Sequence, residues 1–318
     1  MKLHYIKITF SLAIASFLMA GCLKDQPYED QEIQSNRPKG NPRVIEMKIA
    51  ATNTENFLSV AYNNGNNDTV VDLVPIHLAT ADVAGEDINV TVELKPDLVD
   101  AYNQANHTEY EVPVSSLISI VNPVVTIPRG SRTGFLQVKF RPSSIIGHEY
   151  ALGLAIKSVD KANYTISGNL GSGVIAMLIK NKYDGKYKVD GTLVDLVDGS
   201  LSSTPGDPYP FEVELRTVGA NSVVMWEPRN GYYHLIGTGS VYGEFAPVFT
   251  FDPATNKVIS VTNDYGQPSP SRARSAEIDP SGANVQNADK SIDVKYVMKQ
   301  GGGTRTTFDE HFTYLGPR

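Results

Sequence analysis

The feature that most constrains this chain is a repeated alternation of apolar and polar residues with a period of two. An apolar side chain stands at every second position, separated mostly by polar ones, in residues 88–94, 136–140, 211–215 and 292–298. In a pleated strand this period places the apolar side chains on one face. The 3.6-residue period of an amphipathic helix occurs in one short stretch only. The chain is therefore predicted to be all-β.

The first block of strands covers residues 42–180. One helix is expected at residues 96–106, because Pro96 suits a first helical turn and the apolar residues after it share one face. Asn64-Gly65 is a strong turn signal. So many short strands predict a two-sheet β-sandwich. Besides the alternating stretches, its strands are expected at residues 44–50, 57–62, 70–78, 124–127, 150–159 and 173–180.

A second block of strands, at residues 183–318, follows a short polar boundary at residues 181–185. Three consecutive glycines at residues 301–303 turn the chain into its last strand. Antiparallel strands in sequential order predict a C-terminal antiparallel β-barrel, or a barrel-like sandwich, because closure removes exposed edges. The strands are expected at residues 187–197, 211–215, 222–226, 232–237, 247–251, 257–261, 273–278, 292–298 and 306–315.

The composition excludes several classes of function. Acidic residues outnumber basic ones by 35 to 28, which gives a net charge of −7 without any basic run, so binding to nucleic acid is not expected. The six histidines are scattered without the spacing of metal ligands, and no cofactor motif is present. Cys22 is the only cysteine, which excludes a disulfide within the chain.

Residues 1–21 are predicted to be a signal peptide. Two lysines precede an uncharged apolar core that is too short to span a bilayer and that ends in small residues before Cys22. The arrangement of residues 18–22 (Leu-Met-Ala-Gly-Cys) resembles a lipobox, which implies that Cys22 is lipidated and becomes the mature N-terminus. The alternative is an ordinary secretory signal followed by an unrelated cysteine.

Residues 22–41 are polar and acidic, without apolar periodicity, and are expected to form a flexible tether. The acids that follow Cys22 resemble the signal that sends Bacteroidetes lipoproteins to the outer face of the outer membrane. This resemblance implies a lipid-anchored protein exposed on the cell surface. The alternative is that the acidic residues merely reflect the usual composition of a tether.

The sandwich segment carries a more specific resemblance. Residues 98–103 (Leu-Val-Asp-Ala-Tyr-Asn), 109–113 (Glu-Tyr-Glu-Val-Pro) and 127–131 (Ile-Pro-Arg-Gly-Ser) resemble the N-terminal Ig-like domain of Bacteroidetes surface lipoproteins. That family of domains of unknown function includes endoglycosidase-associated and glycan-locus proteins. The resemblance implies that residues 42–180 form an Ig-like β-sandwich.

Residues 183–187 and 312–316 resemble the calycin-like β domains that follow this Ig-like domain. Together the two resemblances imply an outer-membrane lipoprotein that binds a glycan or a related nutrient for a polysaccharide-utilisation uptake system. Its partners would be a porin-like receptor or another lipoprotein of the uptake complex. The alternatives are a structural, adhesin-like protein, a glycosidase accessory protein, and a carrier that holds small molecules in an apolar barrel.

Signatures of an enzyme are missing from the sequence. It has no Gly-x-Ser-x-Gly elbow, no phosphate-binding loop and no His-Glu-x-x-His zinc motif. The endoglycosidase relatives carry an additional α/β barrel, a fold of about 250 residues, for which two β domains leave no room. Glu227, Asp252 and Asp264 are the acids that could form a glycosidase site on the second domain. We therefore predict that the protein is not an enzyme.

Aromatic residues indicate where a ligand would bind, because they are concentrated between Trp226 and Tyr265. Sugars present apolar C–H faces and hydroxyl rims, so their sites pair an aromatic ring with amides, carboxylates or guanidinium groups. The competing interpretation is that the rings fill the barrel interior, and it is preferred for Phe249 and Phe251. The candidate ligand-binding residues are Trp226, Arg229, Asn230, Tyr232, Tyr242, Asp264 and Tyr265.

Overall fold

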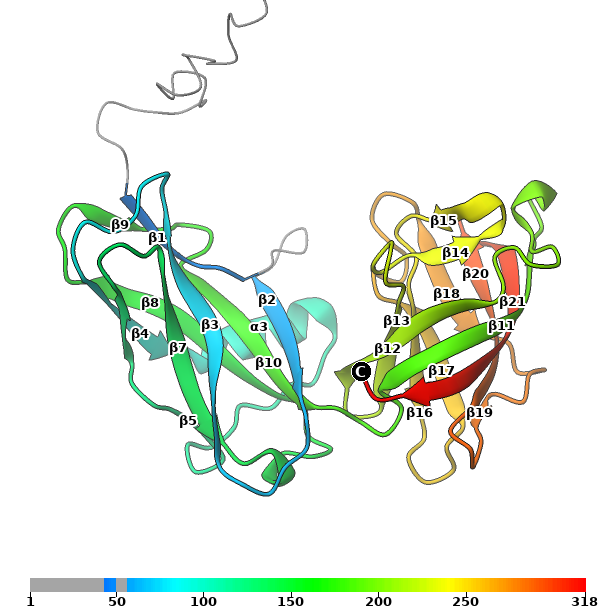
Figure 1. Cartoon of the computed structure of the whole chain (residues 1–318), viewed down its shortest axis with the longest axis horizontal. Coiled ribbons are helices and arrows are strands. Elements are labelled where there is room, and N and C mark those ends of the chain that lie inside the picture. The colour runs from blue at the N-terminus through cyan, green and yellow to red at the C-terminus, as the bar shows by residue number, and fades with distance from the viewer. Residues whose placement is uncertain (1–42, 50–55) are drawn as a thin grey trace, which may run out of the picture.

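The computed structural model describes residues 43–49 and 56–318, which form β-sheets with one short α-helix (Figure 1). The predicted signal peptide, Cys22 and the tether lie outside the described residues. The predicted fold class is confirmed: a β-sandwich precedes a nearly closed antiparallel β-barrel. In the described part of the chain, no helix is both long and apolar enough to cross a membrane.

The sandwich consists of two five-stranded sheets that face each other. The pairs β1–β9 and β2–β10 are parallel, and the other pairs are antiparallel. The first sheet has the order β5-β7-β3-β1-β9, with bounds β1 Arg43–Met47, β3 Thr69–Ala79, β5 Ile118–Ile120, β7 Thr133–Phe140 and β9 Tyr164–Ile166. The second has the order β2-β10-β8-β4-β6, with bounds β2 Phe57–Tyr62, β4 Ile88–Leu94, β6 Val124–Ile127, β8 Tyr150–Val159 and β10 Ser172–Ile179.

The core between the two sheets is apolar. Residues predicted to face inward, such as Val90 of β4 and Val138 of β7, are fully buried. Leu94 differs: it is the last residue of β4 and is half exposed. The sheets also approach closely at Gly134, where a Cβ would lie 2.3 Å from the carbonyl oxygen of Thr126. Burial of apolar surface is therefore the main contribution to the stability of the sandwich.

The helix occupies the expected position, and Asn64-Gly65 lies in a loop whose bend is at residues 66–67. The helix α3 spans Pro96–Asn106, begins with its proline in the first turn and buries Val99 against the outer face of the second sheet. Asn64-Gly65 links β2 to β3, which belong to different sheets, so the turn is a crossover and not a hairpin. A short 3-10 helix, η1, follows β7 at Pro142–Ser144.

The barrel is one antiparallel sheet with the order β17-β16-β13-β12-β11-β21-β20-β18, in which β19 also pairs with β20. A separate hairpin, β14–β15, lies between β13 and β16 in the sequence. The bounds are β11 Gly185–Asp195, β12 Phe211–Gly219, β13 Ser222–Trp226, β14 His234–Ile236, β15 Ser240–Tyr242, β16 Pro247–Phe251, β17 Val258–Asn263, β18 Arg274–Ile278, β19 Val285–Gln286, β20 Ile292–Gln300 and β21 Gly303–Gly316, with 3-10 helices η2 Gly199–Leu201 and η3 Gly237–Gly239.

Side-chain amides connect the two edge strands, β17 and β18. The Nδ2 of Asn263 donates to the carbonyl oxygen of Arg274 at 2.9 Å. The amide of Gln267 accepts from the backbone N–H of Ala276 and donates to the carbonyl oxygen of Ala276, each at 2.7 Å. These groups take the place of ladder hydrogen bonds, so the barrel edges are satisfied without continuous strand pairing.

Aromatic rings fill the barrel interior. Phe249, Tyr296, Phe308 and Phe312 are fully buried, and the rings of Tyr296 and Phe308 stack with their centroids 4.5 Å apart. The interpretation preferred for Phe249 and Phe251 agrees with their burial. An interior occupied by these rings gives no support to the alternative of a carrier with an apolar cavity.

Because neighbouring strands are antiparallel, alternate loops gather at the same end of the barrel. The loops at residues 196–210, 227–246, 264–273 and 301–302 form what we call the distal end, at the upper right of Figure 1. The proximal end carries the link from the sandwich. The predicted ligand-binding residues all belong to β13, β15 or loops at the distal end.

Hydrogen bonds hold the link against the barrel. The side-chain amide of Asn181 donates to the carbonyl oxygens of Gly219 at 3.2 Å and Ser222 at 3.0 Å. Glu149 of the sandwich accepts from the backbone N–H of Ala220 at 2.7 Å. Asp184 accepts from the backbone N–H of Thr217 at 2.8 Å. These hydrogen bonds fix the sandwich to the proximal end of the barrel.

Candidate functional site

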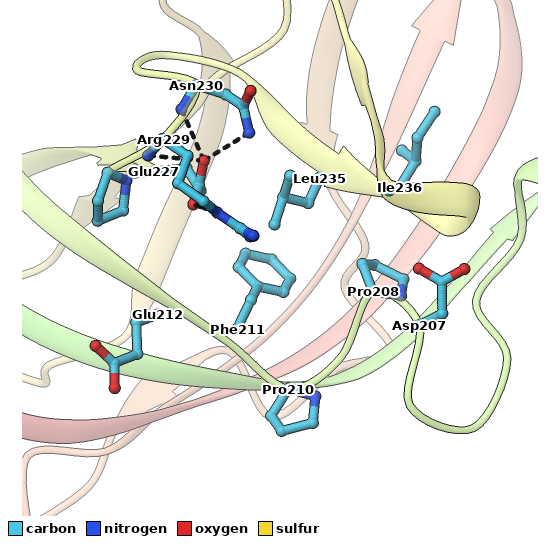
Figure 2. A pocket seen from close by; sticks show the side chains of 12 residues that line it. Asp207, Pro208, Pro210, Phe211, Glu212, Glu227, Arg229, Asn230, Leu235 and Ile236 are labelled. Carbon is cyan, nitrogen blue, oxygen red and sulfur yellow. Dashed lines mark hydrogen bonds and ion pairs between the residues drawn. The ribbon is translucent and has the colours of Figure 1, made fainter.

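The distal end contains a pocket of about 670 Å³ (Figure 2). Three segments form it: residues 207–212, which lead into β12; residues 227–230, which follow β13; and residues 235–239 around β14. The segments meet because the meander returns each of them to the same end of the barrel. We call residues 207–212 the first wall and residues 234–239 the second wall.

The two walls are mainly apolar. Pro208, Pro210 and Phe211 line the first wall, and Leu235 and Ile236 line the second. Figure 2 shows Phe211 and Leu235 facing the same central space. Phe211 is the first residue of β12 and points inward from the barrel wall. The pocket therefore has one largely buried aromatic ring, and its two prolines offer a rigid apolar surface to the C–H face of a ligand.

The polar rim is held in place by Glu227. Its buried carboxylate accepts hydrogen bonds from the backbone N–H groups of Arg229 at 3.1 Å and Asn230 at 2.8 Å. It also accepts from the Nε of Arg229 at 2.9 Å and the Nδ2 of Asn230 at 2.7 Å. Four donors saturate this carboxylate, so its role is to shape the loop.

The same loop leaves Arg229 available to a ligand. Its side chain is 72% exposed, and its terminal nitrogens make no hydrogen bond with the described part of the chain. Figure 2 shows the guanidinium pointing toward the centre of the pocket. On the opposite side, the acids Asp207 and Glu212 also line the pocket. The rim thus combines hydrogen-bond donors with carboxylate acceptors.

A buried polar cluster lies inside the barrel behind both walls. Glu310 accepts hydrogen bonds from the hydroxyl of Tyr209 at 2.6 Å and from that of Tyr296 at 2.8 Å, and His234 Nε2 lies 2.8 Å from the same carboxylate. The side chains of His234 and Glu310 are fully buried. Burial, and after it the Glu310 carboxylate, raises the pKa of Tyr209 and of Tyr296 well above the usual value. Both tyrosines therefore remain neutral donors.

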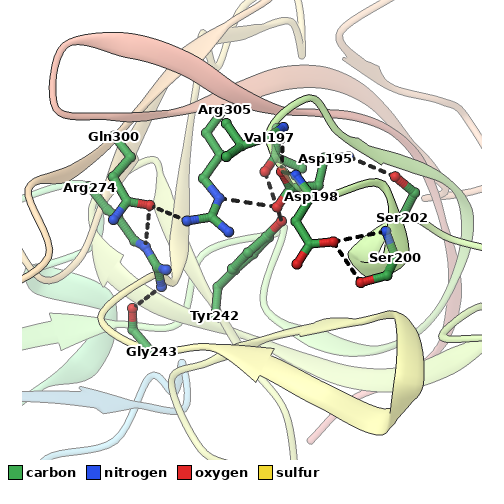
Figure 3. A network of polar contacts seen from close by, with 11 residues as sticks. Asp195, Val197, Asp198, Ser200, Ser202, Tyr242, Gly243, Arg274, Gln300 and Arg305 are labelled. Carbon is green, nitrogen blue, oxygen red and sulfur yellow. Dashed lines mark hydrogen bonds and ion pairs between the residues drawn. The ribbon is translucent and has the colours of Figure 1, made fainter.

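A second buried network ties the distal loops together at Asp195 (Figure 3). Its carboxylate accepts from the hydroxyl of Tyr242 and from the Nε of Arg305 at 3.1 Å. It also accepts from the backbone N–H groups of Val197 and Asp198, each at 2.9 Å. Burial alone raises the pKa of Asp195, but these hydrogen bonds together hold it below its usual value.

The structure gives the predicted residues different roles. Arg229 and Asn230 line the pocket, and Tyr232 is 37% exposed in the adjoining loop. Trp226 lies on the outer wall of the barrel, where the guanidinium of Arg216 stacks 3.5 Å from its ring centroid. That the predicted residues bind a ligand stays a prediction.

Tyr242 has to be removed from the candidate site. Its side chain is only 1% exposed, and its hydroxyl is bonded to Asp195 and, at 2.8 Å, to Thr306. The sequence places it near glycines, a position typical of a surface turn, whereas the β14–β15 hairpin folds it into the barrel end. Tyr242 supports the distal loops and has no surface for a ligand.

Tyr265 and Asp264 lie at the distal end outside the pocket lining. Tyr265 stacks on Tyr233 with the ring centroids 5.7 Å apart, and it packs against Val224 and Val248 on the outer barrel wall. Burial, followed by the hydrogen bond with Tyr233, raises the pKa of Tyr265. Asp264 is exposed beside it. These two residues mark a neighbouring surface and not the pocket itself.

The three acids considered for a glycosidase site do not come together. Asp252 follows β16 at the proximal end, whereas Glu227 and Asp264 follow strands that end at the distal end. Glu227 is also saturated by the hydrogen bonds of its own loop. Within residues 43–49 and 56–318, no group of three or more His, Cys, Asp or Glu side chains could hold a metal ion.

Sequence reasoning missed most of the pocket walls and the cluster behind them. The segment Asp207-Pro208-Tyr209-Pro210 carries a signal that was available, because two prolines around an aromatic residue indicate a rigid, ring-rich loop. Glu310 and His234 carry no such signal. Glu310 lies between two polar residues and His234 among aromatic and aliphatic ones, and the two meet only where β21 and β14 come together in the barrel.

Comparison with known proteins finds a family match for residues 41–163 of this all-β chain. Residues 41–163 match the model of a family described as a "-like, N-terminal domain". This match confirms, over those residues, the resemblance predicted for the sandwich. No curated protein matches the chain.

Solved structures from Bacteroides species are similar to the chain. A protein of unknown function from Bacteroides ovatus is 14% identical, with 86% of this chain and 93% of that chain covered and a TM-score of 0.38. An auxiliary nutrient binding protein from Bacteroides thetaiotaomicron is 15% identical, with 80% and 89% covered and a TM-score of 0.33. EndoBT-3987 of Bacteroides thetaiotaomicron, with its Man5GlcNAc product, is 15% identical over 39% of this chain and 28% of that chain, with a TM-score of 0.31.

Proposed function

We propose that the chain is a non-catalytic protein that binds a neutral glycan in the pocket at the distal end of the barrel. The observation that carries this proposal is the combination of an apolar wall, formed by Pro208, Pro210 and Phe211, with the exposed guanidinium of Arg229 at the rim, which is bonded to Glu227 through Nε only in the described residues. A sugar ring needs both an apolar surface for its C–H face and charged or amide groups for its hydroxyls.

The charge of the pocket supports a neutral ligand. Asp207 and Glu212 line one side, while Glu227 already pairs with Arg229 on the other. An acidic sugar would meet two carboxylates with a single, partly neutralised guanidinium to offset them. Hydroxyl groups, in contrast, donate hydrogen bonds to carboxylates and accept them from Arg229.

The hydrogen bonding and burial of the acids near the pocket support a non-catalytic function. Glycoside hydrolysis needs two carboxylates that face one glycosidic bond. Glu227 is saturated by its loop, and Glu310 is enclosed in the barrel. Asp207 and Glu212 remain at the pocket, so the test of the proposal includes a search for released product.

Attachment to the outer membrane is part of the proposal. Cys22 would carry the lipid, residues 22–41 would form the tether, and the sandwich would hold the barrel away from the membrane for an uptake complex with a porin-like receptor. Tethering raises the local concentration of a site that binds weakly. Labelling with a fatty acid should mark the wild-type chain and not Cys22→Ser, and external protease should remove it from intact cells.

The decisive experiment is affinity electrophoresis through gels that contain neutral plant or host polysaccharides. The wild-type chain should be retarded by at least one of them, and Arg229→Ala should lose about tenfold in affinity because a charged hydrogen bond is removed. Arg129→Ala, which removes an exposed arginine from the sandwich, is the matched control and should not change retention. Retardation only by acidic polysaccharides, equal retention of both variants, or release of reducing sugar would contradict the proposal.

A further inference from the structure

One buried carboxylate contacts both walls of the pocket. Glu310 Oε1 accepts the hydroxyl of Tyr209, which lies between the two prolines of the first wall. The same oxygen lies 2.8 Å from Nε2 of His234, which immediately precedes Leu235 and Ile236 of the second wall. The strand that carries Glu310, β21, contributes no residue to the pocket lining. Glu310 therefore joins the two walls from behind.

The imidazole of His234 has a partner at each of its two nitrogens. Nδ1 lies 2.5 Å from the carbonyl oxygen of Leu235, and Nε2 lies 2.8 Å from Oε1 of Glu310. The two contacts together fix the orientation of the ring between β14 and β21.

The surroundings keep water and competing partners away from the contact between His234 and Glu310. The ring of His234 packs against Phe308 at 4.6 Å, Phe211 at 5.9 Å and Phe245 at 6.3 Å between centroids. Phe211 also lines the pocket, so its ring contacts both the cluster and the site. In such an environment, a lost hydrogen bond is not replaced by solvent.

We propose that Glu310 is a positioning residue of the pocket, which sets the separation of its two walls through Tyr209 and His234. The expected effect on ligand binding rests on the proposed function, because a rigid sugar ring requires walls at a fixed separation. It assigns no chemistry to Glu310, which stays out of reach of any ligand.

The cluster provides its own matched control. Tyr209 and Tyr296 each donate one hydroxyl to Glu310, at 2.6 and 2.8 Å, and both are buried. Only Tyr209 belongs to a pocket wall, because Tyr296 lies on β20 in the barrel. Tyr209→Phe and Tyr296→Phe therefore remove the same group from the same carboxylate, and only one of them releases a wall.

The test is amide hydrogen exchange of the full chain without ligand. In Tyr209→Phe, exchange at residues 207–212 should become about tenfold faster, while residues 234–239, still held through His234, and β21 keep their wild-type rates. In Tyr296→Phe, both walls should exchange as in the wild type. An equal acceleration of walls and β21 in both variants, or no change in either, would overturn the inference, because Glu310 would then contribute to stability alone.

A binding measurement separates this inference from the proposed function. With the neutral polysaccharide that retards the wild type, Tyr209→Phe should lose several-fold more affinity than Tyr296→Phe. If the wild type binds no glycan, the proposed function fails while the exchange experiment still decides the role of Glu310. If glycan binds and the two variants bind it equally, the proposed function stands and the positioning role is wrong.

Discussion

The sandwich and the barrel differ most in what they bury. Among residues 43–49 and 56–318, every buried polar or charged side chain belongs to the barrel, from Asp195 to Glu310, whereas the sandwich core contains apolar side chains only. Apolar packing is non-directional and tolerates repacking. Buried polar groups cost free energy unless each is paired, and a paired group fixes the geometry around it.

The difference teaches where the molecule needs a defined geometry. The clusters around Glu310 and Asp195 both lie behind loops of the distal end, where the pocket opens. The sandwich has no comparable cluster in its described residues, which fits a spacer whose surface only has to be stable. The four predictions below test this division, in order of decreasing expected effect.

Glu310→Ala should have the largest effect. It leaves His234 without its partner in the barrel interior, so the free energy of unfolding of the barrel should fall by about 3–5 kcal/mol. Urea denaturation followed by tyrosine fluorescence measures the change. Glu277→Ala, which removes an exposed acid paired with Lys299, is the control and should leave the midpoint almost unchanged. A loss as small as that of the control would mean that the cluster is not a stabilising unit.

Leu136→Ala should destabilise the sandwich alone. Leu136 is fully buried between the sheets, and its truncation should cost about 2–4 kcal/mol through lost burial and the remaining cavity. Glycan retention below the unfolding transition should stay at the wild-type level, because the sandwich contributes no residue to the pocket. Reduced retention by the folded variant would show that the two halves are not divided as described.

Trp226→Ala should have a smaller effect on stability than its size suggests. The ring lies on the outer barrel wall against Arg216, so its loss should cost about 1 kcal/mol. Phe249→Ala, from the filled interior, should cost about 3–5 kcal/mol and serves as the comparison. Thermal melts of both variants measure the two losses of stability. Similar losses would place Trp226 in the core.

Removal of the charge of Asp195 should have the smallest effect, which is present above about pH 4 and is lost in acid. Because the folded-state pKa of Asp195 lies below its value in the unfolded chain, its carboxylate stabilises the fold above about pH 4. That contribution is lost as the pH falls through the folded-state pKa. Between about pH 5 and pH 3, the free energy of unfolding of the wild type should therefore fall more than that of Asp195→Asn. Parallel losses in both proteins would assign the acid sensitivity to other carboxylates.

Local sequence patterns predicted many of the helix and strand bounds, whereas the ligand-binding site stays a prediction. The helix at residues 96–106 and the strands at residues 57–62, 150–159 and 222–226 have the predicted bounds, because each is encoded by its own periodicity and punctuation. The short strands β5, β9, β15 and β19 were not predicted. With two or three residues each, they are too short for a period to show, and their partners elsewhere in the chain define them.

The site depends on which loops meet, and this is a property of the barrel and not of any one segment. Arg229 and Asn230 were predicted because a polar, amide-rich turn follows an aromatic strand end. Glu310 was not, since its importance comes from Tyr209 and His234, which lie far from it in the sequence. Tyr242 was misplaced for the same reason, because the hairpin that buries it is held by Asp195.

Amide hydrogen exchange of residues 22–318, with and without the oligosaccharide that the affinity gels identify, tests the division between spacer and binding domain most directly. We expect ligand-dependent protection at residues 207–212 and 227–239, no change in the sandwich, and recovery of the oligosaccharide intact. Protection confined to the sandwich, or recovery of a shortened oligosaccharide, would contradict the account.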